Sequence, residues 1–319
     1  MATIYATATL LRIPFSSLWP VAALALLALI VCASYVSILN DLTDAKEDQA
    51  SGKPGRWLGV SRIYPALLLA ACMAAGGGFL IVWRKDTLLF SAYLLCWLAF
   101  TLYSAPPFRL KVRDIWGVLA DAFGAHLFPT LFAVVLLYHW TRATRPVEWT
   151  GLITLWSFAV GVRGILWHQL GDADNDRKIG LRTFACLHTK GAERLGLFGF
   201  FLESLAFIAM LWLTRNALAA IFLVLYGLFA LIRRRLLGIG LAVSKPGQAS
   251  RMAMLEYYIV LYPLAYLLTL SWQQPAALLL LLFHGILFSR QSLYMVHEFV
   301  VMLRMGKSGA GPKTAVFHP

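Results

Sequence analysis

Nine long apolar segments constrain this chain more than any other feature. Each has about the 20 residues that a helix needs to cross the hydrocarbon core of a bilayer. Charged residues make up only 13% of the chain, about half their usual share in a soluble domain. The sequence therefore predicts an all-α fold, a polytopic bundle of about nine transmembrane helices. The predicted spans are residues 15–39, 63–83, 87–104, 115–138, 150–170, 195–214, 217–237, 253–271 and 275–303.

No soluble domain or linker interrupts these segments. We expect a single transmembrane domain over residues 1–306, followed by a short cytoplasmic tail at 307–319. The first apolar segment is too long for a cleavable signal peptide. The four cysteines form no CxxC pair, so the sequence predicts neither a disulfide framework nor a thiolate metal site.

Basic residues are distributed unevenly between the predicted loops. With nine spans, the loops after odd-numbered spans and the C-terminal tail share one side, which holds 20 of the 28 Lys and Arg residues. Positively charged loops stay in the cytoplasm, so we expect the acidic motifs described below to face it. Basic loops near anionic lipid headgroups also account for the net charge of +13, and no nucleic-acid partner is needed. We expect an integral membrane protein of a bacterial inner membrane.

Two rows of polar side chains follow apolar segments. At 100° per residue, Asn40, Asp41, Asp44 and Asp48 fall within about a quarter-turn of one helix face. Such rows of oxygen ligands favour hard divalent cations, Mg²⁺ first.

The second row, Gln169, Asp172 and Asp176, also shares one face, whereas Asp174 points elsewhere. The two rows at the membrane edge predict a metal-clamped diphosphate whose apolar remainder lies among the helices.

Three motifs in this order resemble those of the UbiA superfamily of intramembrane prenyltransferases. They are Asn40-Asp41-x-x-Asp44-x-x-x-Asp48, Tyr103-Ser104-x-Pro106-Pro107-x-Arg109-Leu110-Lys111-x-Arg113, and Asp172-x-x-x-Asp176 followed by Arg182. The resemblance covers about residues 12–270. It implies a transferase of isoprenoid biosynthesis that moves a prenyl group from an isoprenyl diphosphate to an aromatic or lipid acceptor and releases pyrophosphate.

The resemblance also implies roles for individual residues. Five aspartates are the expected catalytic residues and Mg²⁺ ligands: Asp41, Asp44, Asp48, Asp172 and Asp176. Basic and polar residues are expected to bind the substrate: Asn40, Lys53, Arg56, Arg109, Lys111, His168, Gln169 and Arg182. In this scheme the Mg²⁺ ions and the basic side chains make the diphosphate a good leaving group. Membrane lipids are expected to surround the helix bundle.

The chain departs from the family pattern in two places. Gln169 replaces the acid that usually opens the second aspartate motif, which suggests a subfamily with its own substrate. One predicted span precedes the first motif where the family has about two, and four follow the second motif where it has three. We expect that a front helix is missing and a rear one added, that the true start lies upstream, or that the last pair of spans is miscounted.

Other functions fit parts of this pattern. A terpene cyclase of the same superfamily would use the same motifs without an acceptor, and another variant transfers a sugar phosphate to a lipid phosphate. A non-enzymatic membrane transporter or lipid-binding protein is the alternative from another class. The acidic residues gather at one membrane surface, and few charged residues lie near the middle of the predicted spans. This distribution favours a reaction at the membrane surface over transport across the membrane.

Several ionisable residues lie inside predicted spans, where charge is costly. Asp121 and His126 are five residues apart, which places them on faces about 140° apart in an α-helix. Arg163 is expected either to pair with Asp121 or to bind the acceptor. His168 is expected to contact the diphosphate or the acceptor, as an acid or base. Gly76 and the two glycines after it predict close helix packing.

Overall fold

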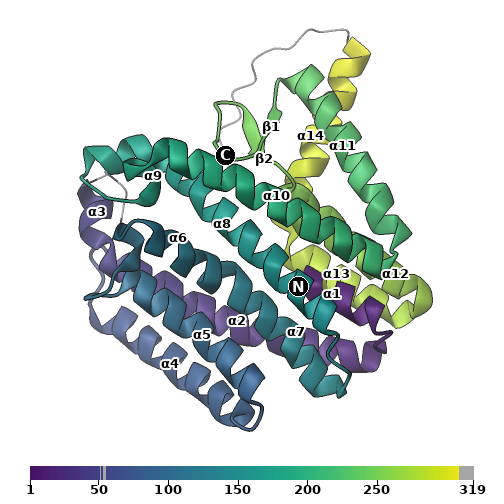
Figure 1. The fold of residues 1–319 in the computed structure, drawn as a ribbon, viewed down its shortest axis with the longest axis horizontal. Coiled ribbons are helices and arrows are strands. Elements are labelled where there is room, and N and C mark those ends of the chain that lie inside the picture. Colours follow the sequence, from purple (N-terminus) through teal and green to yellow (C-terminus); the bar gives the residue numbers. More distant parts are fainter. Residues whose placement is uncertain (51, 53–54, 309–319) are drawn as a thin grey trace. The chain divides into compact units, whose positions relative to one another are not determined.

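The fold is almost entirely helical. The computed structural model describes residues 1–50, 52 and 55–308 (Figure 1). The chain divides into two compact units. We call Pro20–Met210 the motif unit, because it contains all three motifs, and Met1–Trp19 with Leu211–Pro319 the terminal unit. The expected all-α bundle is confirmed; the expectation of a single domain stays a prediction.

The motif unit is built from long helices joined by short connections. Its elements are α2 (Phe15–Thr43, which begins in the terminal unit), α3 (Ala45–Ala50), α4 (Ile63–Trp83), α5 (Thr87–Ser104), η1 (Leu110–Val112), α6 (Ile115–Asp121), η2 (Ala122–Leu127), α7 (Phe128–Thr141), α8 (Val147–Lys178), α9 (Phe184–Leu187) and α10 (Thr189–Thr214, which ends in the terminal unit). The η2 segment is a π-helical turn, so α6, η2 and α7 form one continuous span.

The terminal unit combines an N-terminal helix with the C-terminal third of the chain. Its elements are α1 (Ala2–Leu10), α11 (Ala217–Leu237), the parallel strands β1 (Gly240–Ala242) and β2 (Ser250–Met252), η3 (Tyr257–Leu261), α12 (Tyr262–Gln273), η4 (Pro275–Ala277), α13 (Leu278–Leu287) and α14 (Ser289–Ser308). Helix α1 packs against α12, and Tyr257 donates a hydrogen bond to the Ala219 carbonyl.

Seven helices of the described part of the chain are long and apolar enough to cross a membrane, and they correspond to the first seven predicted spans. The last two predicted spans differ. The α-helical part of the eighth, α12, has only 12 residues. The ninth is broken between α13 and α14, which are bent by 79°. The count of nine is therefore corrected to seven, or eight if the bent pair is one span, because a hydropathy window does not detect a break in the backbone.

The core of the motif unit forms around α8. Its buried residues are Val118, Ala122, Val162, Ile165, Leu166, Leu170, Ala185 and Ala192. Gly161 is needed for this packing, because a Cβ atom there would lie 2.9 Å from the Cα atom of Ala122. The glycine lets η2 approach α8 closely, and this contact positions the inner end of the candidate site described below.

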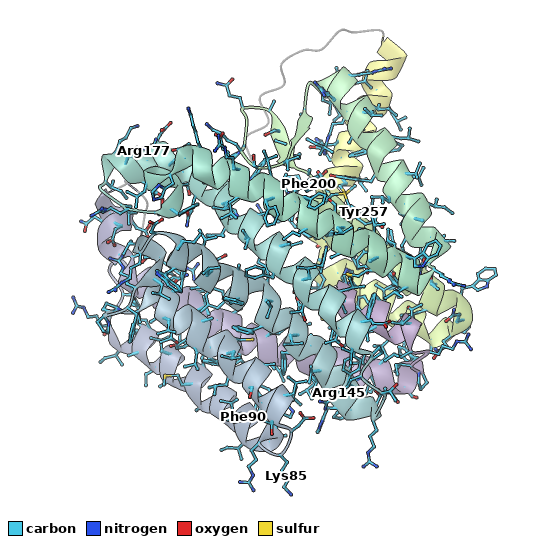
Figure 2. The ribbon with its side chains drawn as sticks, in the orientation of Figure 1. Lys85, Phe90, Arg145, Arg177, Phe200 and Tyr257 are labelled. Atoms are coloured by element: carbon cyan, nitrogen blue, oxygen red, sulfur yellow. The ribbon has the colours of Figure 1, made fainter. Side chains whose placement is uncertain are left out.

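A buried ion pair joins α8 to α10. The Arg163 guanidinium donates to both carboxylate oxygens of Glu203, at 2.6 and 2.7 Å, and both side chains are fully buried. Arg163 also lies over the Phe200 ring, which Figure 2 labels on α10. The expected pairing of Arg163 with Asp121 is therefore wrong. Its partner is an acid 40 residues later in the chain, which only the packing of α10 against α8 supplies.

A second buried ion pair network lies in the terminal unit. Arg233 of α11 donates to Glu256 at 2.8 Å and to Glu298 of α14 at 3.0 Å, and Arg251 of β2 donates to the other oxygen of Glu298 at 2.8 Å. Two positive and two negative charges balance within this network. Paired charges are the form in which ionised side chains are tolerated in an apolar bundle.

The three consecutive glycines of α4 give a sharp test of the helix packing. A Cβ atom at Gly76 would lie 2.2 Å from the Trp97 ring, whereas a Cβ atom at Gly77 would meet nothing within 4 Å. Trp97 is itself held between Tyr35 and Tyr93. We expect Gly76→Ala to lower the free energy of unfolding by about 1–3 kcal/mol through overpacking. The matched variant Gly77→Ala should be neutral or slightly stabilising, because alanine favours helix. Equal unfolding midpoints in detergent for both variants would contradict this packing.

Candidate functional site

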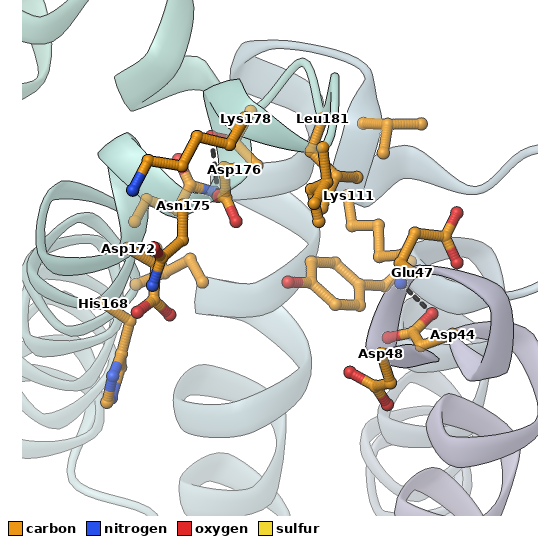
Figure 3. Close-up of a pocket in the computed structure, with 16 residues that line it drawn as sticks. Asp44, Glu47, Asp48, Lys111, His168, Asp172, Asn175, Asp176, Lys178 and Leu181 are labelled. Carbon is orange, nitrogen blue, oxygen red and sulfur yellow. Dashed lines mark hydrogen bonds and ion pairs between the residues drawn. The ribbon is translucent and has the colours of Figure 1, made fainter. Parts of the chain in front are cut away.

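All three sequence motifs meet at one cavity of the motif unit. The cavity has a volume of about 440 Å³. It is lined by Asp44, Glu47, Asp48, Tyr103, Lys111, Val112, Ile165, His168, Gln169, Asp172, Asn175, Asp176, Lys178, Ile179, Leu181 and Thr183. In Figure 3 the residues of α8 form one wall, and Asp44, Glu47 and Asp48 form the facing wall.

The first wall is formed where α2 ends and α3 begins. The Thr43 hydroxyl donates to the backbone carbonyls of Leu39 and Asn40, at 3.0 and 3.2 Å, in the last turn of α2. Such local side-chain bonds compete with the helix ladder and favour a bend. Helix α3 then starts at Ala45. Asp44 therefore lies at the break between the helices, and Asp48 lies one turn further along α3.

The second wall is one face of the last three turns of α8. His168, Asp172 and Asp176 are four residues apart and line the cavity in a row. The extension of α8 to Lys178 places the entire second motif on a regular helix. Asp174, as expected, points elsewhere: it is 92% exposed and pairs with Arg177 at 2.8 Å.

The loop between α5 and α6 brings cations to the first wall. Lys111 donates to Asp44. Arg109 lies 2.8 Å from Glu47 and 3.4 Å from Asp44. The first aspartate motif and the basic loop, which are some 65 residues apart in sequence, thus form one charged cluster.

Backbone contacts hold this basic loop against the end of α8. Asp114 forms a parallel β-bridge with Thr183, and His188 lies 3.2 Å from the Asp114 carboxylate. Thr183 also donates to Asp176 at 3.5 Å. The segments that follow α5 and α8 are therefore joined, and this junction helps to keep Lys111 and the second aspartate motif at the same cavity.

Five of the predicted site residues that the structure describes do not line the cavity: Asn40, Asp41, Arg56, Arg109 and Arg182. Asn40 accepts a hydrogen bond from Ser104, and Asp41 pairs with Arg56 at 3.0 Å. The Arg56 side chain is 60% exposed, and Arg182 is exposed. Arg109 contacts two residues of the lining, Asp44 and Glu47, and donates to the Thr43 carbonyl at 3.3 Å. Lys53, also predicted, lies outside the described residues.

The other predicted residues do line the cavity: Asp44, Asp48, Lys111, His168, Gln169, Asp172 and Asp176. Gln169 is buried and accepts a hydrogen bond from the Ala185 amide at 3.3 Å, so its side chain anchors the segment after α8. The roles proposed for all these residues remain predictions.

Sequence reasoning missed several charged or polar residues that line the cavity, among them Glu47, Asn175 and Lys178. Glu47 follows Asp44 by three residues, and Asn175 follows Asp172 by three. Residues three apart share a helix face, as residues four apart do. The spacing of Glu47 and Asn175 from the predicted aspartates could therefore have identified them from the sequence. Lys178 has no such signal, because its position depends on where α8 ends.

The cavity lining is strongly acidic. Five carboxylates and two lysines line it, which leaves an excess of negative charge. Burial raises the pKa of Glu47, but the hydrogen bond from Arg109 and the charges of Arg109 and Lys111 outweigh it, so the pKa lies below its usual value. Glu47 is therefore ionised at neutral pH. Its Oε2 atom is nevertheless buried without a hydrogen-bond partner among the described residues.

The donor set fits hard divalent cations. The ligands offered are carboxylate oxygens, and the orphaned Glu47 oxygen can accept an ion. Among the described residues, however, no three His, Cys, Asp or Glu side chains are close enough to hold one ion. Each wall can therefore supply part of a coordination shell, which water or a bound polyanion would complete.

Comparisons with known proteins agree with the motifs. A curated rice protein, the probable homogentisate phytyltransferase 2 of Oryza sativa subsp. japonica, is 28% identical over 207 residues, covering 61% of this chain and 49% of its own. The 2-acylphloroglucinol 4-prenyltransferase of Humulus lupulus is 29% identical over 204 residues, covering 60% and 47%. The chain thus spans about half the length of these relatives. A comparison with solved structures found no match.

The match to a protein family is more extensive. It covers residues 1–239, which include the entire motif unit and every cavity-lining residue. With its long apolar helices, this chain is an integral membrane protein and belongs to the UbiA prenyltransferase family.

Proposed function

We propose that this chain is a Mg²⁺-dependent intramembrane prenyltransferase, which moves a prenyl group from an isoprenyl diphosphate to an aromatic or lipid acceptor and releases pyrophosphate. One observation carries the proposal. Carboxylates from two segments far apart in the sequence, Asp44 and Asp48 on one wall and Asp172 and Asp176 on the other, face each other across one cavity that Lys111 also lines. The names of the rice and hop relatives, which are prenyl or phytyl transferases, support the same reaction class.

Each part of the cavity has a proposed task. Asp44 and Asp48 on one wall, and Asp172 and Asp176 on the other, would hold Mg²⁺ ions. When bound, these ions supply Lewis-acid stabilisation of the departing pyrophosphate. Lys111 would contact a phosphate oxygen as a point charge, while Glu47 keeps Arg109 in place beside it. Breaking the carbon–oxygen bond to the diphosphate would leave an allylic cation, which the aliphatic part of the lining (Val112, Ile165, Ile179 and Leu181) would help to shield from water. The acceptor would then attack this cation at carbon and lose a proton.

The orientation in the membrane is also a proposal. Arg177 lies near one end of the motif unit, whereas Lys85 and Arg145 lie near the opposite end (Figure 2). Within the motif unit, the connections that follow α2, α5 and α8 are, taken together, richer in Lys and Arg than those that follow α4 and α7, and we assign the Arg177 side to the cytoplasm. We further propose a bacterial inner membrane and a single transmembrane domain.

Pyrophosphate release from the purified protein tests the proposed reaction. The protein in detergent is given geranylgeranyl diphosphate, with and without a membrane extract as the source of acceptor, and the products are extracted for mass spectrometry. We expect a prenylated product only with the extract, and loss of turnover when EDTA removes the divalent ions, with recovery on adding Mg²⁺.

Two other results would contradict the proposal. A cyclised hydrocarbon formed without extract would identify a terpene cyclase. Turnover that is insensitive to EDTA, or no turnover with prenyl diphosphates of any chain length, would refute a metal-dependent transferase.

A further inference from the structure

The terminal unit carries most of the net positive charge of the chain. It holds 11 Lys and Arg residues and two acids, Glu256 and Glu298, which leaves +9 of the net +13 in this unit. Both acids are buried, and they pair with Arg233 and Arg251. The remaining basic residues therefore have no acidic side chain of their own unit to neutralise them.

An apolar groove lies between α11 and α14 in this unit. Its volume is about 700 Å³, within the range of about 300–1,000 Å³ that is usual for sites that hold small molecules. Tyr226 and Met302 are buried at its floor, whereas Leu228 and Phe299 are half exposed at its walls. The groove is therefore open along one side. It is lined by Leu225, Tyr226, Leu228, Phe229, Ile232, Leu236, Leu261, Met295, Phe299, Met302 and Leu303.

The buried ion-pair network lies directly behind the groove. Arg233 of α11 pairs with Glu298 of α14 at 3.0 Å, and this contact joins the two helices that form the walls. The Arg233 guanidinium carbon also lies 5.3 Å from the centroid of the Phe229 ring, which lines the groove. Phe299, the residue after Glu298, lines the facing wall. Because separating a buried pair is costly, the network fixes the spacing of the two walls.

The groove has the depth of one lipid leaflet. Along α11 its lining extends from Leu225 to Leu236, which is about 17 Å at a rise of 1.5 Å per residue. Half of a hydrocarbon core about 30 Å thick is about 15 Å. Since α11 begins at Ala217 and ends at Leu237, the groove starts near the middle of this span and ends in its last turn. One acyl chain from a single leaflet therefore matches its length.

Two arginines lie where the groove ends. Arg235 is exposed and follows Leu228 and Ile232 of the lining by seven and three residues, so it shares their face of α11. Arg304 is exposed and directly follows Leu303 of the α14 wall. Neither guanidinium group bonds to another described residue. The two helices pack together, and both end toward the top of the view in Figure 1. The apolar groove thus opens beside two available cations.

This charge distinguishes between possible occupants. A second copy of the chain, related by a two-fold axis along the membrane normal, would bring its own Arg235 and Arg304 to the same depth. Like charges facing each other across an interface oppose association. An anionic phospholipid instead offers an acyl chain to the groove and a negative headgroup to the arginines. Basic residues at the membrane surface attract such headgroups.

We propose that the groove between α11 and α14 binds one acyl chain of an anionic phospholipid, whose phosphate group is held by Arg235 and Arg304. This site is independent of the proposed prenyl transfer, because it lies in the terminal unit and its α14 wall lies beyond the residues 1–239 that match the family. The distribution of basic residues assigns the arginine end of α11 to the cytoplasm, so the lipid comes from the cytoplasmic leaflet.

Native mass spectrometry of the full-length protein tests the choice of headgroup. The purified protein in detergent is given equal amounts of dioleoyl-phosphatidylglycerol and dioleoyl-phosphatidylcholine, which have the same acyl chains but differ in net charge. We expect the protein to retain phosphatidylglycerol over phosphatidylcholine by at least about fivefold, the size of one arginine contact at the membrane surface. Equal retention of the two lipids, or retention of neither, would overturn the proposal.

Two arginine variants from the same helical turn locate the headgroup. Arg235→Gln should lower the retention ratio by about fivefold. The matched control is Arg234→Gln, because Arg234 lies two residues after Ile232 and therefore about 200° around α11 from the groove face. This control should keep the wild-type ratio within about twofold. Equal losses in both variants would indicate a diffuse attraction to the basic surface and would refute a site at the groove.

A second pair of variants tests the acyl chain. Ile232→Trp places a larger side chain in the groove and should lower the retained phosphatidylglycerol at least about fivefold. The matched control Leu231→Trp changes an exposed neighbour outside the lining and should retain as much lipid as wild type. If Ile232→Trp does not fold, Leu228→Trp fills the same groove from another half-exposed position.

Two outcomes of this second test would reject the lipid. Wild-type retention in the groove-filling variant would mean that the acyl chain lies elsewhere. A dimer mass that is present in the wild-type protein and absent in Ile232→Trp would mean that a second copy of the chain covers the groove.

Discussion

Replacing Asp172 with asparagine is expected to lower the rate of pyrophosphate release by at least about 100-fold. The amide has the shape of the carboxylate but lacks its charge. Asp172 lies in the middle of the α8 row, where it lines the cavity opposite Asp44 and Asp48. Loss of one preorganised electrostatic contact to the developing charge typically costs a factor of about 10²–10³. The affinity for prenyl diphosphate in Mg²⁺ should fall in parallel.

The matched control is Asp174→Asn, two residues away on the same helix. Asp174 is 92% exposed and pairs with Arg177 outside the cavity, so this variant should retain nearly the wild-type rate. Initial rates of pyrophosphate release, measured with a membrane extract at several Mg²⁺ concentrations, compare the two. Equal losses in both variants, or nearly full activity in Asp172→Asn, would remove the second aspartate row from the site. Asp44→Asn applies the same test to the facing wall.

The second large effect is expected at the buried ion pair between α8 and α10. Glu203→Gln should lower the free energy of unfolding of the protein by about 3–5 kcal/mol, because it leaves the Arg163 charge buried with a neutral partner. The Arg163 guanidinium now donates to two carboxylate oxygens. An amide offers a single oxygen, so the bidentate bond is lost as well. Denaturant titration in detergent, followed by circular dichroism, measures the change.

A double variant separates the pair from its surroundings. Arg163→Met with Glu203→Leu replaces both charges by apolar side chains of similar length, and it should be much more stable than Glu203→Gln. The contrary result, with the double variant at least as unstable as the single one, would mean that packing rather than the unpaired charge determines the cost.

Much of the site was predictable from the sequence because helical periodicity is local. The i+4 spacing of Asp44 and Asp48, and of His168, Asp172 and Asp176, fixes which side chains share a face once the segments are helical. These residues do line one cavity. Asp41 satisfies the same periodicity but pairs with Arg56 instead. Asp41 lies within the last turn of α2, whereas Asp44 lies at the interruption between α2 and α3 and Asp48 lies within α3.

The residues that periodicity could not predict depend on contacts between distant segments. Arg109 acquires Glu47, and Arg163 acquires Glu203, because separate helices pack together. The π turn at η2 also depends on a contact between separate helices, because η2 packs closely against Gly161 of α8. Local propensity alone would favour an ordinary α-helix there. That single wider turn moves Asp121 and His126 from different faces to one side.

By itself, the sequence determined the membrane-spanning helices, the two acidic rows and the family. Apolar length and 3.6-residue periodicity are properties of short stretches, and the energetic cost of exposing peptide groups to lipid leaves helices as the available structure. Tertiary structure alone decided the ion-pair partners, the break between α13 and α14, and the convergence of the three motifs on one cavity. These features depend on which helix faces pack together, and that choice is made by side-chain contacts between segments far apart in the chain.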